Sequence, residues 1–161
     1  SEGIWNNKKY FFDYDNLGIR LKSNWPFNEK NPVKHQYGKQ EVVVHAISHN
    51  IDFNNTLQIE CFNWKDSNSN SSQLIKFIIN RHNLRLITKP KNGNFKGHQS
   101  IFVRAISEDK DMNYNFSMRI VTLTSSHKAL VLIARYNSRN ENAGRDILDS
   151  FEKHLVIKET S

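Results

Sequence analysis

The sequence predicts an α+β fold, in which a mainly antiparallel β-sheet of about six to eight strands is covered by two or more helices. Most of the chain divides into short segments in which apolar and polar residues alternate, the pattern of strands with one buried face. Two other segments carry apolar residues at helical spacing, and each follows a run of strands. At 161 residues the chain is expected to form a single domain, residues 1–161.

The first expected element is a hairpin within residues 8–27, KKYFFDYDNLGIRLKSNWPF. Its turn is placed at Asp15-Asn16-Leu17-Gly18, because Asn and Gly tolerate positive φ angles. The second strand alternates apolar and polar residues, and Pro26 ends it, since proline has no N–H to pair. Residues 28–39, NEKNPVKHQYGK, are expected to form a polar loop.

The middle of the chain is expected to hold two strands, a linker and a helix. The strands are QEVVVHAISH at 40–49 and TLQIECFNW at 56–64. The linker, KDSNSNSS at 65–72, ends in two serines that suit a helix N-cap. The helix is predicted over 73–82, with one apolar face formed by Leu74, Ile75 and Ile78. Its β-branched residues also favour a strand, and that alternative stays open.

Four more strands and a helix complete the expected fold. The strands are placed at residues 84–90, 98–109, 114–126 and 128–137. The last two form a hairpin in the middle of the sheet, with its turn at Ser125-Ser126-His127. A helix over 140–155 is expected to close the chain and to pack on the sheet through one apolar stripe, formed by Ile147, Leu148, Phe151 and Leu155.

Two stretches of the chain resemble the PsbP-like family, whose fold is shared with DcrB-like envelope proteins of bacteria and with the Ran-binding Mog protein. Residues 14–26, YDNLGIRLKSNWP, are similar to the family's strand into a Trp-Pro bend. Residues 129–155 are similar to its apolar strand, polar loop and helix. The resemblance implies an α/β/α sandwich. It also implies a binding module, since family members mostly bind or stabilise other proteins and share no catalytic machinery.

Composition limits the classes of function. The 23 Lys and Arg exceed the 16 Asp and Glu, and the net charge of +7 favours an acidic protein, nucleic acid or an anionic surface as partner. The single cysteine, Cys61, excludes an intrachain disulfide and is expected to be a buried strand residue rather than a nucleophile. No apolar run is long enough to span a membrane. No signal peptide is visible, but the sequence lacks an initial Met, so removal of an export signal or lipid anchor stays open.

No pattern of residues predicts a reaction, so the protein is expected not to be an enzyme and to hold no cofactor or metal. His45 and His49 have the spacing of a helical zinc pair but lie in a predicted strand, where residues four apart are about 13 Å apart. Ser, His and Lys at 125–128 belong to a hairpin turn rather than a triad. Asp109 and Asp111 lack the Gly and terminal Glu of a calcium loop.

The charge pattern indicates one candidate binding surface. Residues 88–99, TKPKNGNFKGHQ, predict an exposed and mobile basic loop between two strands. An acidic partner is expected to contact this loop together with the basic end of the preceding helix. The candidate binding residues are Arg81, Arg85, Lys89, Lys91 and Lys96.

The expected function is therefore a non-enzymatic protein-binding or accessory module. The resemblance places it in the bacterial periplasm or envelope, or in a secretion or assembly system, with the cytoplasm as the alternative location. Two other functions stay open. The +7 charge favours a nucleic-acid or anionic-surface binder, and a pocket between sheet and helix would favour a small-ligand carrier.

Overall fold

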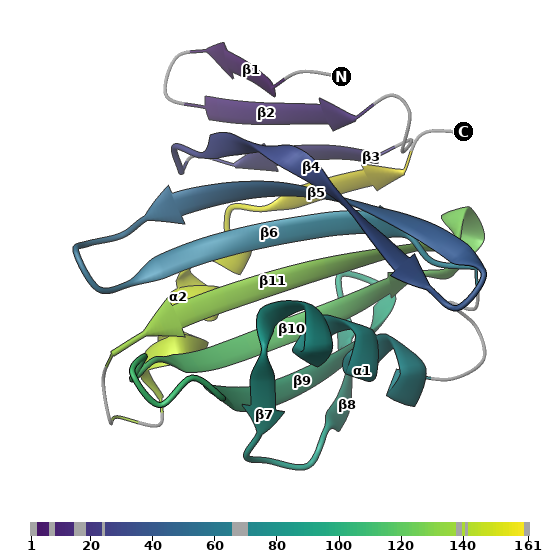
Figure 1. Cartoon of the computed structure of the whole chain (residues 1–161). Helices are drawn as coiled ribbons and strands as arrows, with labels where there is room; N and C mark the ends of the chain where they lie inside the picture. Colours follow the sequence, from purple (N-terminus) through teal and green to yellow (C-terminus); the bar gives the residue numbers. More distant parts are fainter. Residues whose placement is uncertain are drawn as a thin grey trace.

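The computed structural model describes residues 3–6, 9–14, 19–23, 25–65, 71–137, 140 and 142–159, with side chains described from Arg20 onward. Within these residues the chain forms two antiparallel sheets, two α-helices and one 3₁₀ turn (Figure 1). The expected turn at Asp15–Gly18 lies outside the described residues.

The larger sheet has the strand order β4-β5-β6-β11-β10-β9-β7, and β8 also pairs with β9. Figure 1 shows that its long strands curl into a half-barrel. The predicted hairpin β10–β11 lies in the middle of this sheet, as expected, and its turn includes His127 in the left-handed conformation. The bounds are β4 (Asn28–Tyr37), β5 (Gln40–Asn50), β6 (Thr56–Asn63), β7 (Leu84–Leu86), β8 (Lys91–Phe95), β9 (His98–Ser107), β10 (Asn115–Leu123), η1 (Thr124–Ser126) and β11 (Lys128–Tyr136).

The smaller sheet joins the two ends of the described chain. Its strand order is β1-β2-β3-β12, with β1 (Gly3–Asn6), β2 (Lys9–Tyr14), β3 (Ile19–Ser23) and β12 (Val156–Glu159). The strands β2 and β3 confirm the predicted hairpin. The expectation that a helix closes the chain is wrong, because β12 follows the last helix and pairs with β3.

The two helices lie on opposite faces of the larger sheet. The helix α1 (Ser71–His82) confirms the helical alternative for this segment, and its apolar face is buried as predicted. The helix α2 (Ala143–Glu152) buries Leu148 and Phe151. In β11, Val131 faces the α1 side and Leu132 faces the α2 side. This strand is covered on both faces, which explains its nearly continuous apolar sequence.

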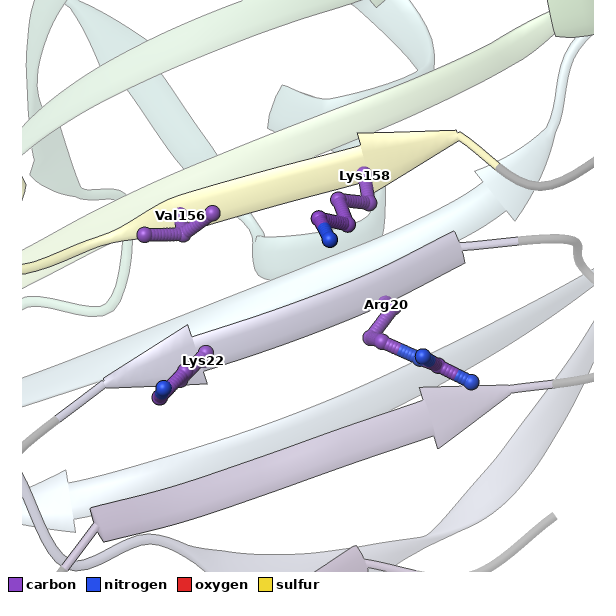
Figure 2. Close-up of a pocket in the computed structure, with 4 residues that line it drawn as sticks. All are labelled: Arg20, Lys22, Val156 and Lys158. Carbon is purple, nitrogen blue, oxygen red and sulfur yellow. The ribbon is translucent and has the colours of Figure 1, made fainter.

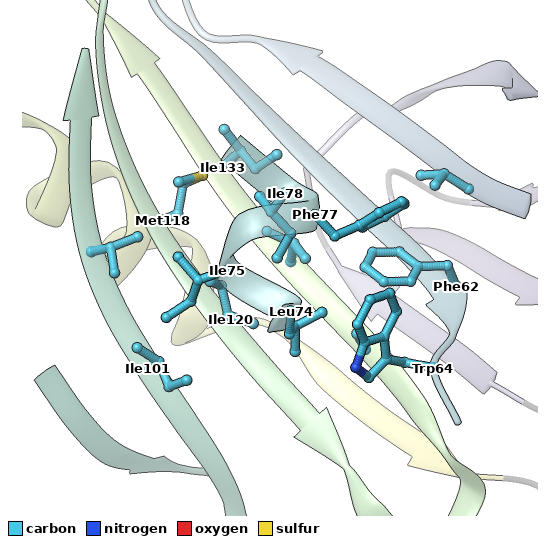
Figure 3. Close-up of a cluster of buried hydrophobic side chains, with 14 of the residues drawn as sticks. Phe62, Trp64, Leu74, Ile75, Phe77, Ile78, Ile101, Met118, Ile120 and Ile133 are labelled. Atoms are coloured by element: carbon cyan, nitrogen blue, oxygen red, sulfur yellow. The ribbon is translucent and has the colours of Figure 1, made fainter. Parts of the chain in front are cut away.

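Each face of the larger sheet has its own core. Figure 3 shows the core under α1, in which the helix residues Leu74 and Ile78 meet Met118 and Ile133 of the sheet and the rings of Phe62, Phe77 and Trp64. On the other face, α2 covers the sheet together with Leu21 of β3 and Ile157 of β12. The second core is therefore closed by one helix and by the edge of the smaller sheet.

The predicted α+β fold with an α/β/α sandwich is wrong, because the described residues form a β-rich fold built on a curled half-barrel sheet with two helices. Length explains part of this difference. The ten residues of α2 span about 15 Å, whereas the ten residues of β9 span about 33 Å. A helix as short as α2 leaves much of that face of the larger sheet uncovered. The strands β3 and β12, rather than a further helix, cover the rest.

The polar loop expected at residues 28–39 is also wrong, since most of this segment is the edge strand β4. Its residues are mostly exposed, so no alternation of apolar residues marks it. The register with β5 shifts between Lys30 and Val33, where Pro32 lies. A bulge and a proline are typical of edge strands, because both hinder the addition of another strand.

The structure confirms that Phe151 packs on the sheet and that the hairpin strand ends before Pro26. Phe151 is fully buried. Trp25 and Pro26 follow β3 and lie outside the paired strands. The Trp25 ring lies 5.4 Å from the Phe151 ring, and Phe27 contacts the same ring at 5.5 Å. The bend after β3 thus covers the core under α2.

One glycine determines how closely α2 approaches the sheet. A Cβ atom at Gly144 would lie 2.2 Å from Ser117 Oγ and 2.3 Å from Tyr136 Cε1. Ser117 and Tyr136 are both buried, and their hydroxyl groups share a hydrogen bond of 3.1 Å. Only a residue without a side chain fits this contact, so Gly144 is required for docking of the first turn of α2.

Candidate functional site

The predicted basic residues do not form one site. Arg85 pairs with Glu108 at 3.4 Å, and both side chains are exposed. Lys89 precedes β8, Lys91 begins it and Lys96 lies in the turn that follows it. These residues are exposed, but they are spread along the segment rather than gathered around a pocket.

The loop expected at 88–99 is largely a β-hairpin. Its strand β8 pairs with β9 in continuous register from Lys91–Phe102 to Phe95–His98. Lys96 and Gly97 form the turn with φ angles of 49° and 85°, and the Asn94 side chain accepts a hydrogen bond from the Gly97 N–H. The predicted exposure of the lysines is confirmed, but most of the segment is paired with β9 rather than a free loop.

Arg81 lies away from this hairpin, in a buried polar network. Its Nη2 and Nε atoms donate to the Glu60 carboxylate at 2.8 and 3.2 Å. Glu60 is 0% exposed, at the centre of β6. His82 donates to the same carboxylate at 3.0 Å, and the Gln58 amide donates at 2.7 Å. Arg81 Nη1 also donates to His35 Nε2 at 2.6 Å. These five residues are called the Glu60 network.

The charges within the Glu60 network are fixed by its hydrogen bonds. Burial alone would raise the pKa of Glu60, but the hydrogen bonds and charges of His82 and Arg81 outweigh it and lower the pKa to about 2. Burial, followed by the Arg81 charge, lowers the pKa of His35. A carboxylate that stays ionised is a weak general base near neutral pH. The network therefore anchors the end of α1 to β6 and β4.

A small open pocket of about 280 Å³ adjoins the Glu60 network. It lies between β4 and α1, and its lining residues are His35, Gln36, Tyr37, Phe77, Asn80 and Arg81. The Tyr37 and Phe77 rings meet edge to face at 5.7 Å. The guanidinium of Arg81 is already engaged by Glu60 and His35, so its main bonding capacity is used within the protein.

The other residues considered for chemistry in the sequence lie in a strand, in the core or in a turn contact. His45 and His49 lie on β5, as expected, and the residues that the structure describes contain no His, Cys, Asp and Glu cluster suited to a metal. Cys61 is buried, and burial raises its pKa to about 12, which opposes a role as nucleophile. The Ser125 and Ser126 hydroxyl groups both donate to the Glu159 carboxylate of β12. They therefore link the β10–β11 turn to the smaller sheet.

Sequence reasoning missed an almost fully exposed aromatic residue. Phe53 is 97% exposed, at the turn between β5 and β6, and Ile51 beside it is 37% exposed. The Asp52 carboxylate accepts hydrogen bonds of 2.9 Å from the N–H groups of Asn54 and Asn55 and from the Asn55 side chain. The Asn55 carbonyl accepts from the N–H groups of Ile51 and Asp52 at 2.9 and 3.2 Å.

These bonds make the β5–β6 turn (Ile51–Asn55) a well-defined platform for Phe53. The hydrogen bond from the Asn54 N–H, followed by those from Asn55, lowers the pKa of Asp52. This carboxylate therefore stays charged at neutral pH. In the sequence, this site could have been recognised from the aromatic residue within the turn sequence DFNN, where small polar residues are usual.

No protein-family model matches this chain, and the curated proteins give no significant match. The resemblance to the PsbP-like family therefore stays a prediction. In the described ranges neither helix has both the length and the apolar character needed to cross a bilayer.

Proposed function

We propose that the protein is a non-enzymatic binding module that attaches to another protein through the β5–β6 turn, with Phe53 as the central contact. The supporting observation is the combination of an almost fully exposed phenyl ring with a turn held by its own hydrogen bonds. The partner offers an apolar pocket that accepts this ring.

The energetics favour such a contact. Moving a Phe side chain from water into an apolar pocket stabilises a complex by about 1.5–3 kcal/mol. A turn that already holds its bound conformation loses little entropy on association. Rigid aromatic residues are among the commonest dominant contacts in protein interfaces.

The charge of the turn favours a protein over a polyanion. Residues 51–55 contain the ionised Asp52 and no Lys or Arg. An anionic membrane or nucleic acid would be repelled by this carboxylate, since both are bound mainly through cations around the inserted or stacking residue. The bulge and proline of β4 also disfavour attachment by strand addition.

Site-specific crosslinking tests the proposal. A photoreactive benzoyl-phenylalanine at position 53, in cells that produce the protein, is expected to yield a discrete protein adduct. The same residue at Lys39, an exposed position in the turn at the other end of β5, serves as the control and should not yield it. Excess unlabelled protein should suppress the adduct, whereas excess Phe53→Ser protein should not.

If excess Phe53→Ser protein suppresses the adduct as effectively as the unaltered protein does, the role of Phe53 is refuted. Adducts with lipid or nucleic acid alone would refute the choice of a protein partner. Because Phe53 is exposed, the thermal midpoint of the Phe53→Ser variant should match that of the unaltered protein, so loss of folding cannot explain a difference.

A further inference from the structure

A second site lies on the outer face of the β3–β12 pair (Figure 2). Arg20 and Lys22 of β3, with Val156 and Lys158 of β12, line a pocket of about 340 Å³. The antiparallel register sets Lys158 directly opposite Arg20, and Val156 directly opposite Lys22. Since side chains alternate along a strand, these four point away from Leu21, which faces the core. Three cations are therefore gathered on one face of the β3–β12 pair.

Among the described side chains, no acidic residue lines this pocket. Glu159 follows Lys158, but alternation places it on the opposite side, where its carboxylate accepts hydrogen bonds from Ser125 and Ser126. The backbone register brings one acidic residue of β2, Asp13, opposite Arg20. The described lining of the pocket therefore consists of three cations and one apolar residue.

The register sets two cations, Arg20 and Lys158, opposite each other across this pair. Like charges directly opposite each other destabilise an antiparallel pair. The β3–β12 pair has a short register, from Val156–Lys22 to Glu159–Ile19, so one repulsive position affects much of it. An anion between Arg20, Lys22 and Lys158 would turn this repulsion into attraction.

The walls of the pocket indicate what the anion carries. The surface of the pocket is formed mainly by apolar atoms, and among the described residues these include the aliphatic stems of the cations and the exposed side chain of Val156. The charged ends of long basic side chains reach solvent while their stems cover apolar surface. Such walls suit a ligand whose charged group is joined to an apolar chain.

We propose that this pocket binds an organic phosphate monoester with an apolar substituent, either as a free small molecule or as the exposed headgroup of a lipid. Phosphate matches the site because guanidinium and ammonium groups both donate to its oxygens. The proposal is independent of the protein contact at Phe53.

Titration calorimetry with hexyl phosphate, inorganic phosphate and hexanol tests the proposal. Hexyl phosphate is expected to bind at least about tenfold more tightly than inorganic phosphate, because burial of two methylene groups suffices for that factor. Hexanol is expected not to bind. Equal affinity for hexyl and inorganic phosphate, or no binding of either, would overturn the proposal.

Matched variants locate the binding. Lys22→Gln combined with Lys158→Gln should weaken hexyl phosphate binding by at least tenfold, while Lys158→Arg should retain it. The control, Lys34→Gln with Lys89→Gln, removes the same charge from exposed positions elsewhere and should leave the affinity within about twofold. An equal loss in both double variants would show that net charge alone attracts the anion, and would contradict a site.

Vesicles distinguish the two sources of the phosphate. Binding to vesicles that contain phosphatidic acid, lost in the Lys22→Gln/Lys158→Gln variant but kept in the control, would assign the pocket to a lipid headgroup. Hexyl phosphate binding without vesicle binding would assign it to a free small molecule. In the absence of any ligand, the thermal midpoint of the Lys22→Gln/Lys158→Gln variant should equal or exceed that of the unaltered protein, because the repulsion between positions 20 and 158 has been relieved.

Discussion

The two faces of the larger sheet are held to their helices by different chemistry. Under α1, the fully buried carboxylate of Glu60 accepts from Arg81 and His82, both at the end of the helix. Under α2 the centre is apolar, and the ion pair between Arg119 and Glu152 lies nearer the surface, with an N–O distance of 2.6 Å. Docking of α1 therefore depends on charge as well as on its buried apolar face, whereas docking of α2 depends mainly on shape.

The pKa values of the two carboxyl groups move in opposite directions. The pKa of Glu60 is lowered to about 2, because His82 and Arg81 outweigh the effect of burial. The pKa of Glu152 is raised, because burial outweighs the Arg119 charge. A buried carboxylate stays ionised only where its partners offset the free-energy cost of removing its charge from water. The helix α1 supplies both ionic partners of Glu60. The comparison thus predicts that substitutions and acid should change the stability of the α1 face and of the α2 face differently.

The largest expected effect comes from removing one member of the buried pair. Arg81→Met should lower the free energy of unfolding by about 3–5 kcal/mol, because Glu60 is left buried without its main partner. Urea denaturation at pH 7 measures this change. The matched variant on the other face, Arg119→Met, should cost about 1 kcal/mol or less, since that pair is partly exposed. Equal costs would remove the distinction between the faces.

Truncation of the apolar contact on the α2 face should have an effect of similar size. Phe151→Ala should cost about 3–5 kcal/mol, as for other fully buried phenylalanines. Phe53→Ala provides the control, because it deletes the same atoms at an exposed position and should change stability by less than about 0.5 kcal/mol. Thermal and urea denaturation of both variants would check the difference.

Adding a single methyl group to α2 should have a smaller but clear effect. Gly144→Ala should cost about 1–3 kcal/mol, because the new Cβ forces Ser117 and Tyr136 away from the helix. Alanine is the better helix former, so an exposed glycine in a helix would show the opposite sign. An unchanged or raised urea midpoint would mean that α2 does not depend on this close contact.

Mild acid should loosen the α1 face. The pKa of His35 is lowered in the folded protein, so the folded state binds a proton less readily than the unfolded state. Stability from this residue is complete above the ordinary histidine pKa and is lost as pH falls below it. Stability from Glu60 is lost only at lower pH, from about 4.5 toward 2. Glu152 has the opposite sign, because its raised pKa favours protonation in the folded state.

Hydrogen exchange at pH 7 and pH 5 tests this difference. Amides of α1 should exchange faster relative to the intrinsic rate at pH 5, while those of α2 should not. His35→Gln keeps an acceptor for Arg81 without a titrating group, so this variant should lose the dependence of α1 on pH. A dependence that persists in His35→Gln would assign it to another residue.

The smallest expected effect on stability is at the basic hairpin. Reversing Lys89, Lys91 and Lys96 to Glu should shift the thermal midpoint only slightly, because all three side chains are exposed and outside both cores. If these residues contact an acidic partner, association should slow at low salt. A loss of stability comparable with that of Arg81→Met would show that the hairpin supports one of the faces.

The elements that could be predicted from sequence are those with apolar periodicity. The central strands and both helices bury an apolar face, so their spacing revealed them. The edge strand β4 could not be recognised, because it is stabilised by pairing with β5 while its side chains stay exposed. The short β12 contains too few residues for a period to be recognised.

The sites were less predictable, because their residues meet only through the tertiary fold. Arg81 contacts Glu60, 21 positions earlier, and His35, 46 positions earlier. A count of basic residues therefore grouped Arg81 with Lys89, Lys91 and Lys96 in and around β8, although the charge of Arg81 is used inside the protein. The charge pattern could not show that Glu60 is buried, which follows from its central place in the sheet.

The pairing of β12 with β3 also has a consequence for biosynthesis. Lys22 and Val156 are register partners, so β3 must wait for a strand that is synthesised near the end of the described chain. Until then Leu21 lacks the neighbour that closes the second core, and the open edge of β3 is available to other chains. Contacts between distant parts of a sequence form slowly. The nascent protein is therefore most exposed to misassembly in the interval before β12 leaves the ribosome.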